Sequence, residues 1–450
     1  TSALGANTIG TECTAVGQGA LDASNGSYNT AVGSDTLGTN TSGTNNTAVG
    51  RLALYANTTG ANNVALGNLA LTANTTAGSN VAIGDQSLKT NTTGASNTAV
   101  GQGSLQANTT ASNNVAVGND ALAANTTGTA NVAVGNSSGD ALTTGHYNTM
   151  VGHGSLSADT KGTRSVAIGM QALAAQNFTS ETSAYNTAVG FVAGQAVTTG
   201  VQNTLIGALA GDGMTTGGNN TAVGYESLSS VCTGSYNTAV GRIAMNAMTS
   251  GTENTGLGNA ALYANTTGNY NTSVGSDSLK ANISGHNNTA LGFEALQAST
   301  ASNNTALGYQ AGLVIGTGFA NTIIGTVAGD ALTTGSVNTA VGYSALGAET
   351  DGTGNVAMGE DAQGLSNGGV NNTCIGTTAG YQISTGANNL ALGHDASRSG
   401  SPGGALTTGS NQICLADENI THAYVQVDWT ISSDARDKTD FTALDLGLDF

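Results

Sequence analysis

Charged side chains are scarce in this sequence: they make up 8 % of its 450 residues, whereas typical globular chains carry about 25 %. Uncharged Asn, Thr, Ser and Gly must therefore cover most of the surface. Basic residues are the scarcest, with nine Lys and Arg against 27 Asp and Glu and a net charge of −18. Because nucleic-acid affinity depends on clustered basic side chains, this balance excludes nucleic acid as a partner.

Proline, cysteine and long apolar runs are also nearly absent. The one proline is Pro402, and no stretch approaches the ~20 apolar residues of a membrane span, so we expect no membrane insertion. The four cysteines, Cys13, Cys232, Cys374 and Cys414, lie far apart. Cys374 takes a slot that alanine usually fills, which favours a small buried side chain over a disulfide or a metal set. We expect no metal and no cofactor.

Glycine is abundant instead, with 67 residues, and many of them close a repeated Asn-Thr-Ala-Val-Gly motif. The motif occurs 23 times at a spacing of 17 residues, apart from two steps of 16 and one of 21 between Gly169 and Gly190. Such a period is typical of a solenoid whose coils stack in register. We therefore predict an all-β fold, a parallel β-solenoid of about 23 coils. At ~4.8 Å per coil it would form a rod on the order of 110 Å long.

The strand of each coil ends in an apolar residue that precedes the glycine, and the residue before that is Ala in 17 of the 23 copies. Because side chains alternate across a strand, these two neighbours point to opposite faces. We expect one of them to face the interior of the coil and the small Ala on the other side to press against a second chain. The pattern thus predicts oligomerisation.

Asn stands four residues before the glycine in 21 of the 23 copies. An Asn at a turn can bond its own backbone and tolerates left-handed φ, and copies stacked at ~4.8 Å can form an amide ladder. The column is therefore predicted to be structural. Glycosylation of the Asn-x-Thr triplets stays open only for a chain that passes through a glycosylating secretory route.

Two kinds of coil differ in where their apolar side chain stands. In the commoner kind Leu follows the glycine by four residues, as at Leu54 and Leu122. In the other kind Gly takes that slot, as at Gly139, and the apolar residue moves three places on, to Leu142. Coil length is unchanged, so we expect the core to need one such side chain per coil.

The repeat fades near the end of the chain. We divide the sequence into a shaft at residues 1–410, a degraded last coil and transition at 411–431, and a charged segment at 432–450 that contains Ser433-Asp434-Ala435-Arg436-Asp437-Lys438-Thr439-Asp440. This run resembles the start of the intramolecular chaperone (S74 peptidase) domain of phage tail fibres and tailspikes, whose pattern is Ser-Asp-x-Arg-x-Lys-x-Asp. The resemblance implies a homotrimeric fibre that cleaves itself once between Ser433 and Asp434, with Ser433 as nucleophile and Lys438 as its base.

The repeats separately resemble the head repeats of trimeric autotransporter adhesins, which share an Asn-x-Val-Ala-Ile-Gly-like strand. Asn80-Val-Ala-Ile-Gly84 is a close match, although the period is longer here. The chain shows no membrane-anchor segment of that family.

The leading functional hypothesis is a parallel homotrimeric fibre of a phage tail or virion, extracellular, that binds a glycan or protein of the host cell surface. A bacterial surface or matrix filament is the alternative. Ice binding by ranks of Thr is a minor one, since Thr and Asn also serve strands and turns.

We do not expect a metabolic enzyme. A glycan-cleaving tailspike would need two carboxylates across a groove, but acidic residues stand at variable positions and most aromatics are isolated. The four-residue insertion near residues 176–181 is the one place where a loop can leave the shaft. We therefore predict that it is the lateral binding feature.

Overall fold

The computed structural model describes residues 3–5, 7–401, 403–422 and 424, and in this part of the chain every regular element is a strand. Twenty-four three-residue strands form one parallel sheet, and β10 and β12 form a separate pair. The strands are β1 (Thr14–Val16), β2 (Thr30–Val32), β3 (Thr47–Val49), β4 (Val64–Leu66), β5 (Val81–Ile83), β6 (Thr98–Val100), β7 (Val115–Val117), β8 (Val132–Val134), β9 (Thr149–Val151), β10 (Gly162–Thr163), β11 (Val166–Ile168), β12 (Thr182–Ser183), β13 (Thr187–Val189), β14 (Thr204–Ile206), β15 (Thr221–Val223), β16 (Thr238–Val240), β17 (Thr255–Leu257), β18 (Thr272–Val274), β19 (Thr289–Leu291), β20 (Thr305–Leu307), β21 (Thr322–Ile324), β22 (Thr339–Val341), β23 (Val356–Met358), β24 (Thr373–Ile375), β25 (Leu390–Leu392) and β26 (Ile413–Leu415).

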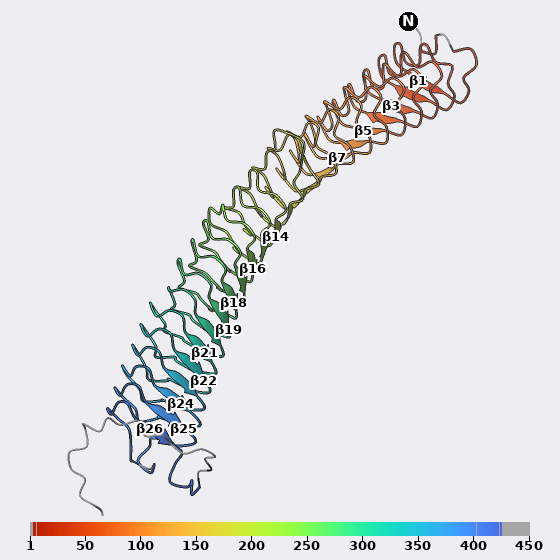
Figure 1. Ribbon diagram of the computed structural model, residues 1–450. Coiled ribbons are helices and arrows are strands. Elements are labelled where there is room, and N and C mark those ends of the chain that lie inside the picture. The colour runs from red at the N-terminus through yellow and green to blue at the C-terminus, as the bar shows by residue number, and fades with distance from the viewer. Residues whose placement is uncertain (1–2, 6, 402, 423, 425–450) are drawn as a thin grey trace, which may run out of the picture.

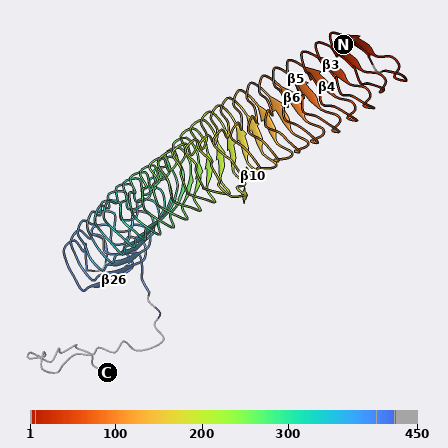
Figure 2. The same ribbon diagram turned by 90° about the horizontal axis from the view of Figure 1, so that it is seen from above.

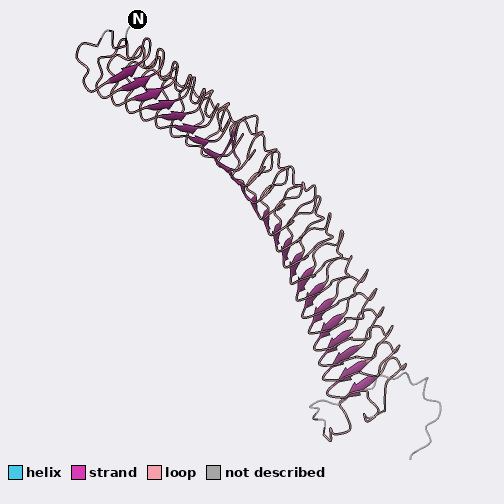
Figure 3. Ribbon diagram, turned by 180° about the vertical axis from the view of Figure 1, so that it is seen from behind, coloured by secondary structure: helices cyan, strands magenta, loops and turns pink. Residues whose placement is uncertain are grey.

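The coils stack into a long, curved rod with the N-terminus at one end (Figure 1). Each strand pairs with the strand of the next coil, so that Ala99, for example, lies beside Ala116. The sheet therefore runs as one band along one side of the rod, while turns form the other sides (Figure 3). The predicted parallel β-solenoid with a 17-residue coil is confirmed.

The alanine column lies inside the rod, and our expectation that it faces a second chain is wrong. In β6 the side chain of Ala99 is fully buried, whereas Thr98 and Val100 on either side of it are partly exposed. The buried side chain of Leu105 belongs to the same core and leaves little space beside the strand. A small side chain in the strand leaves room for this Leu.

Coils in which Gly replaces the Leu four residues after the repeat glycine also show how the alanine column and the Leu column share the core. Gly139 has the left-handed φ of 61° that Leu122 also adopts, at 52°, so the backbone of the coil does not change. A Cβ at Gly139 would lie 2.5 Å from Met150 Sδ, and one at Gly194 would lie 2.6 Å from Leu205 Cδ1. A large side chain in the alanine column thus fills the space that Leu leaves, and Leu142 adds the expected buried apolar group.

The predicted Asn ladder is present and fully buried. Asn97 Nδ2 donates to Asn80 Oδ1 at 3.2 Å and to the carbonyl of Ala111 at 2.9 Å. A second ladder, seven residues after the glycine, joins Asn57 Nδ2 to Asn40 Oδ1 at 2.9 Å. The sequence did not lead us to this second ladder, because its Asn residues resembled ordinary turn residues.

No disulfide joins the four cysteines. Cys374 is fully buried in the alanine column, which confirms the interpretation of this residue as a small core side chain. Burial raises the pKa of its thiol to about 12.

Candidate functional site

The two residues implied as a self-cleaving pair, Ser433 and Lys438, lie outside the described residues. Their role stays a prediction from the resemblance. The last strand of the sheet, β26, pairs in parallel with β25 and places the degraded coil on the end of the rod. Three surfaces of the described chain remain as places where function can reside.

The first surface is the outer face of the sheet. It is formed by the first and third residues of each strand, which include Leu66 at 41 % exposure and Leu291 at 45 %. None of the 24 strands of this sheet contains a charged residue. The face is about 10 Å wide and about 110 Å long, or about 1,100 Å². Of its 48 outward residues, 16 are Thr and 32 are Val, Leu, Ile or Met, so about 700 Å² of the face is apolar, which exceeds the largest apolar patch of about 300–600 Å² on a typical monomer.

The second surface surrounds the insertion, where β10 and β12 pair at the side of the rod (Figure 2). Phe178 turns inward and is buried, while residues 177 and 179–181 are exposed. The buried carboxylate of Asp159 fixes this loop: it accepts hydrogen bonds from the backbone N–H of Phe178 at 3.1 Å and from Gln176 Nε2 at 2.7 Å. Asp159 and Gln176 occupy the column of the second Asn ladder, a column that also holds Leu142 and Val197 in coils without an insertion.

Beside the insertion, Arg164 lies between two tyrosines of the neighbouring coils. Its guanidinium carbon is 5.4 Å from the centre of the Tyr147 ring and 5.8 Å from that of Tyr185, distances typical of cation–π contacts. Arg164 Nη1 also donates to Ser183 Oγ at 2.6 Å. All three side chains are exposed, with Tyr147 at 57 % and Tyr185 at 53 %. We call Tyr147, Arg164 and Tyr185 the lateral cluster.

The lateral cluster belongs to one column, because each member stands five residues before a repeat glycine. Each adopts a left-handed φ, of 62°, 62° and 51°. With this backbone, the three side chains project outward from equivalent positions of successive coils. The lateral binding feature was predicted in the insertion and stays a prediction, whereas the cluster lies beside it. Its shared column can be recognised in the sequence, because the three members precede Gly152, Gly169 and Gly190 by five residues each.

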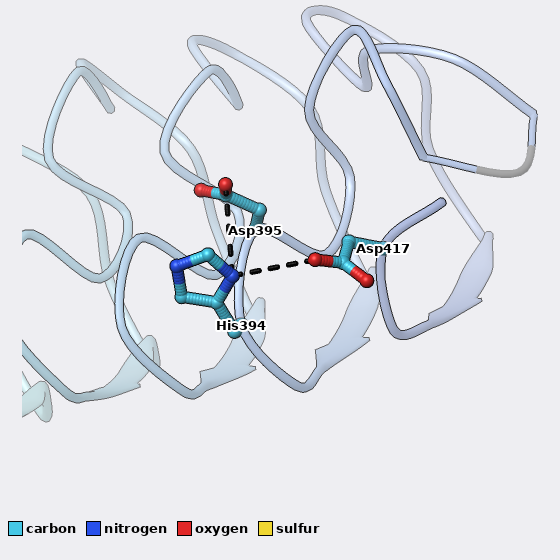
Figure 4. Close-up of side chains that lie close together, drawn as sticks. All are labelled: His394, Asp395 and Asp417. Atoms are coloured by element: carbon cyan, nitrogen blue, oxygen red, sulfur yellow. Dashed lines mark hydrogen bonds and ion pairs between the residues drawn. The ribbon is translucent and has the colours of Figure 1, made fainter. Parts of the chain in front are cut away.

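The third surface is a group of titratable side chains on the last two coils, shown in Figure 4. His394 Nδ1 lies 3.3 Å from Asp417 Oδ2 and 3.6 Å from Asp395 Oδ2. These three residues offer donor atoms close enough together to hold a metal ion. However, Arg398 Nη1 pairs with Asp395 Oδ1 at 2.6 Å, and its charge opposes a cation there. We therefore interpret the group as a hydrogen-bonded network in which the contact between His394 and Asp417 ties the last coil to the shaft.

Hydrogen bonds lower the pKa values of the two carboxyl groups in this network. Hydrogen bonds from Thr378 and Arg398 hold the pKa of Asp395 below its usual value, and those from Asn419 do the same for Asp417. Both carboxylates are thus ionised at neutral pH and accept hydrogen bonds across successive coils.

Comparison with known proteins adds no identification. No family model matches the chain, and no curated protein matches it. Within the described ranges there is also no helix of the length and hydropathy that a membrane crossing needs. The function must therefore be argued from the surfaces themselves.

Proposed function

We propose that the chain is the shaft of an extracellular fibre, most simply of a phage tail or virion, in which three copies pack in parallel and project a surface that attaches to a host cell. The observation that carries this proposal is the uncharged outer face of the sheet. A standard interface buries about 800 Å² per partner, and the face offers about 1,100 Å².

A second copy suits this face better than an unrelated partner. The side chains recur once per coil, every ~4.8 Å, so only an object with the same repeat can contact the face evenly along its length. Another copy of the chain has that repeat. Parallel packing would bring the Val column of one copy against the corresponding columns of its neighbours, and the fibre would resist salt because no charges take part.

The mass of the native assembly tests this proposal. We expect a species of three chains, each of 43.9 kDa before the predicted cleavage, that persists in high salt and that dissociates when Val100→Glu and Val117→Glu place charges on the face. Thr93→Glu, on an exposed turn, is the control and should leave the trimer intact. A wild-type chain that stays monomeric at micromolar concentration would contradict the proposal.

The predicted self-cleavage gives a separate test of phage origin. The mature chain should end at Ser433, and Ser433→Ala should leave the following segment attached, as intact mass spectrometry would reveal. A wild-type chain that keeps residues 434–450 after assembly would count against the resemblance to the chaperone domain but not against the trimer.

Ice binding is the second candidate, because the first residue of the strand is Thr in 16 of the 24 strands of the sheet. The same face cannot bind ice and be covered by other copies. A monomer that shows thermal hysteresis would favour ice binding, and a trimer without it would favour the fibre.

A further inference from the structure

The coil that contributes Arg164 to the lateral cluster carries two basic residues on an otherwise acidic rod. The described chain contains seven Lys and Arg residues, and Lys161 and Arg164 are the only two that share a coil. Neither forms an ion pair with a carboxylate among the described residues, whereas Lys280 and Arg398 do. Because the net charge of −18 repels anions elsewhere, this is the place on the described rod where an anion is best received.

The guanidinium of Arg164 is held in position with part of its hydrogen-bonding capacity unused. Tyr147 and Tyr185 contact it, and Nη1 donates to Ser183 Oγ at 2.6 Å and to Thr163 Oγ1 at 3.4 Å. In the part of the chain that the structure describes, its Nε and Nη2 groups donate to no protein acceptor. A planar guanidinium with free N–H groups matches the two oxygens of a carboxylate, and its fixed position lowers the entropic cost of binding.

The tyrosines suit a sugar better than a simple inorganic anion. Each presents an apolar ring and a hydroxyl group to solvent, and neither hydroxyl has a protein partner within the described ranges. Such amphipathic side chains contact C–H faces and hydroxyl groups together. The cluster extends over three coils, or about 10 Å, which is long enough for more than one sugar ring.

We propose that Tyr147, Arg164 and Tyr185 bind an acidic oligosaccharide, with a sugar carboxylate on the Arg164 guanidinium and neighbouring rings against the tyrosines. This proposal rests on the attachment function proposed above and names the ligand class. The exposed insertion residues 177 and 179–181 precede Ser183, the acceptor of Arg164 Nη1, in the chain, and Glu181 is the one acidic residue among them.

The chain contains its own matched control. Tyr236, Glu253 and Tyr270 stand in the same column of three successive coils, all exposed and with φ of 62°, 57° and 58°. This second trio has the opposite central charge, and its coils lack the insertion that supplies Ser183. It follows that Arg164→Glu is compatible with the backbone at this position, and that Glu253→Arg places an arginine between two tyrosines of the same column without the insertion.

Calorimetric titration of the full chain with an oligogalacturonide and a sialyl-oligosaccharide tests the site. The methyl-ester form of each probe keeps the sugar but removes the carboxylate charge. We expect at least one acidic probe to bind, its ester to bind at least tenfold more weakly, and Arg164→Glu to reduce affinity at least tenfold. Arg164→Lys should lose most of this affinity, and Glu253→Arg should raise the number of sites per chain.

Unchanged binding by Arg164→Glu, equal affinity for acid and ester, or no binding of either probe would overturn the proposal. Binding of only a sulfated disaccharide would overturn the assignment to carboxylates. Native mass measured on the same samples separates the two proposals: an intact trimer that binds no probe refutes the site alone, and a monomer that binds through Arg164 refutes the assembly alone.

Discussion

Replacing Asn97 by alanine tests how much the first Asn ladder contributes to the stacking of coils. The side chain of Asn97 is fully buried. Its Oδ1 accepts the backbone N–H of Asn114 at 3.0 Å, and its Nδ2 donates to Asn80 Oδ1 and to the carbonyl of Ala111. The substitution removes these bonds without adding bulk, so the effect reports on the ladder.

The expected loss of stability depends on which groups keep a hydrogen-bond partner after the substitution. Asn80 Oδ1 still accepts the backbone N–H of residue 97 at 3.0 Å, and the Ala111 carbonyl still accepts Asn108 Nδ2 at 3.0 Å. The buried N–H of Asn114 loses its acceptor, and Asn114 Nδ2 loses its bond to Asn97 Oδ1 but keeps the carbonyl of Gly128. An unpaired buried donor costs about 1–3 kcal/mol and each of the three other lost bonds about 1 kcal/mol net, so we expect a local loss of about 4–6 kcal/mol.

Native-state hydrogen exchange is the appropriate assay, because each coil of a solenoid contacts only its neighbours and the loss should be local. The Asn114 amide should exchange about 700–20,000-fold faster, since 1.4 kcal/mol corresponds to a factor of ten. Thr93→Ala is the control, because its exposed hydroxyl forms no side-chain hydrogen bond with the described residues. Equal exchange at Asn114 in the two variants would refute the argument.

Three further outcomes are expected. Met150→Ala should lower the free energy of unfolding by about 2–5 kcal/mol in denaturant titrations, because Gly139 leaves no side chain to fill the space; an unchanged midpoint would contradict this. Burial raises the pKa of Asp140 above its ordinary 3.8, so the folded chain loses stability as the pH rises through 3.8 to the folded pKa. Asp140→Asn should therefore raise the melting temperature at pH 7 but not below pH 3.8. Alkylation at pH 8 should modify half-buried Cys13 and spare Cys374, whose pKa is about 12; rapid labelling of Cys374 in the folded chain would show that its coil opens.

The repeat predicted the fold because identical residues that lie above one another must share one environment. Ala99 and Ala116 are neighbours in the sheet for this reason alone. Strand alternation, however, says only that Ala99 and Val100 point to opposite faces, not which face is the core. That choice depends on the volume left by Leu105, a relation between different columns that the strand motif by itself does not contain.

The lateral cluster escaped sequence reasoning for a related reason. Tyr147, Arg164 and Tyr185 are 17 and 21 residues apart, so the insertion hides their common column until the extra residues are placed before Tyr185. The structure places them together because β13 resumes the register of β11 after the loop. A search for unusual residues at fixed distances before each glycine would have found them.

The uniform and the variable columns of the repeat separate stability from recognition. The buried columns of Asn and Ala are nearly uniform because each member must match the coils above and below it. The column five residues before the glycine carries Tyr, Asn, Arg, Glu, Gln, Ser, Ala, Val and Gly, all with left-handed φ. Since these exposed side chains leave the inner ladder unchanged, one residue can alter the surface of the rod without altering how it folds. Opposite charges at Arg164 and Glu253, between equivalent tyrosine pairs, are the arrangement that such a surface would produce.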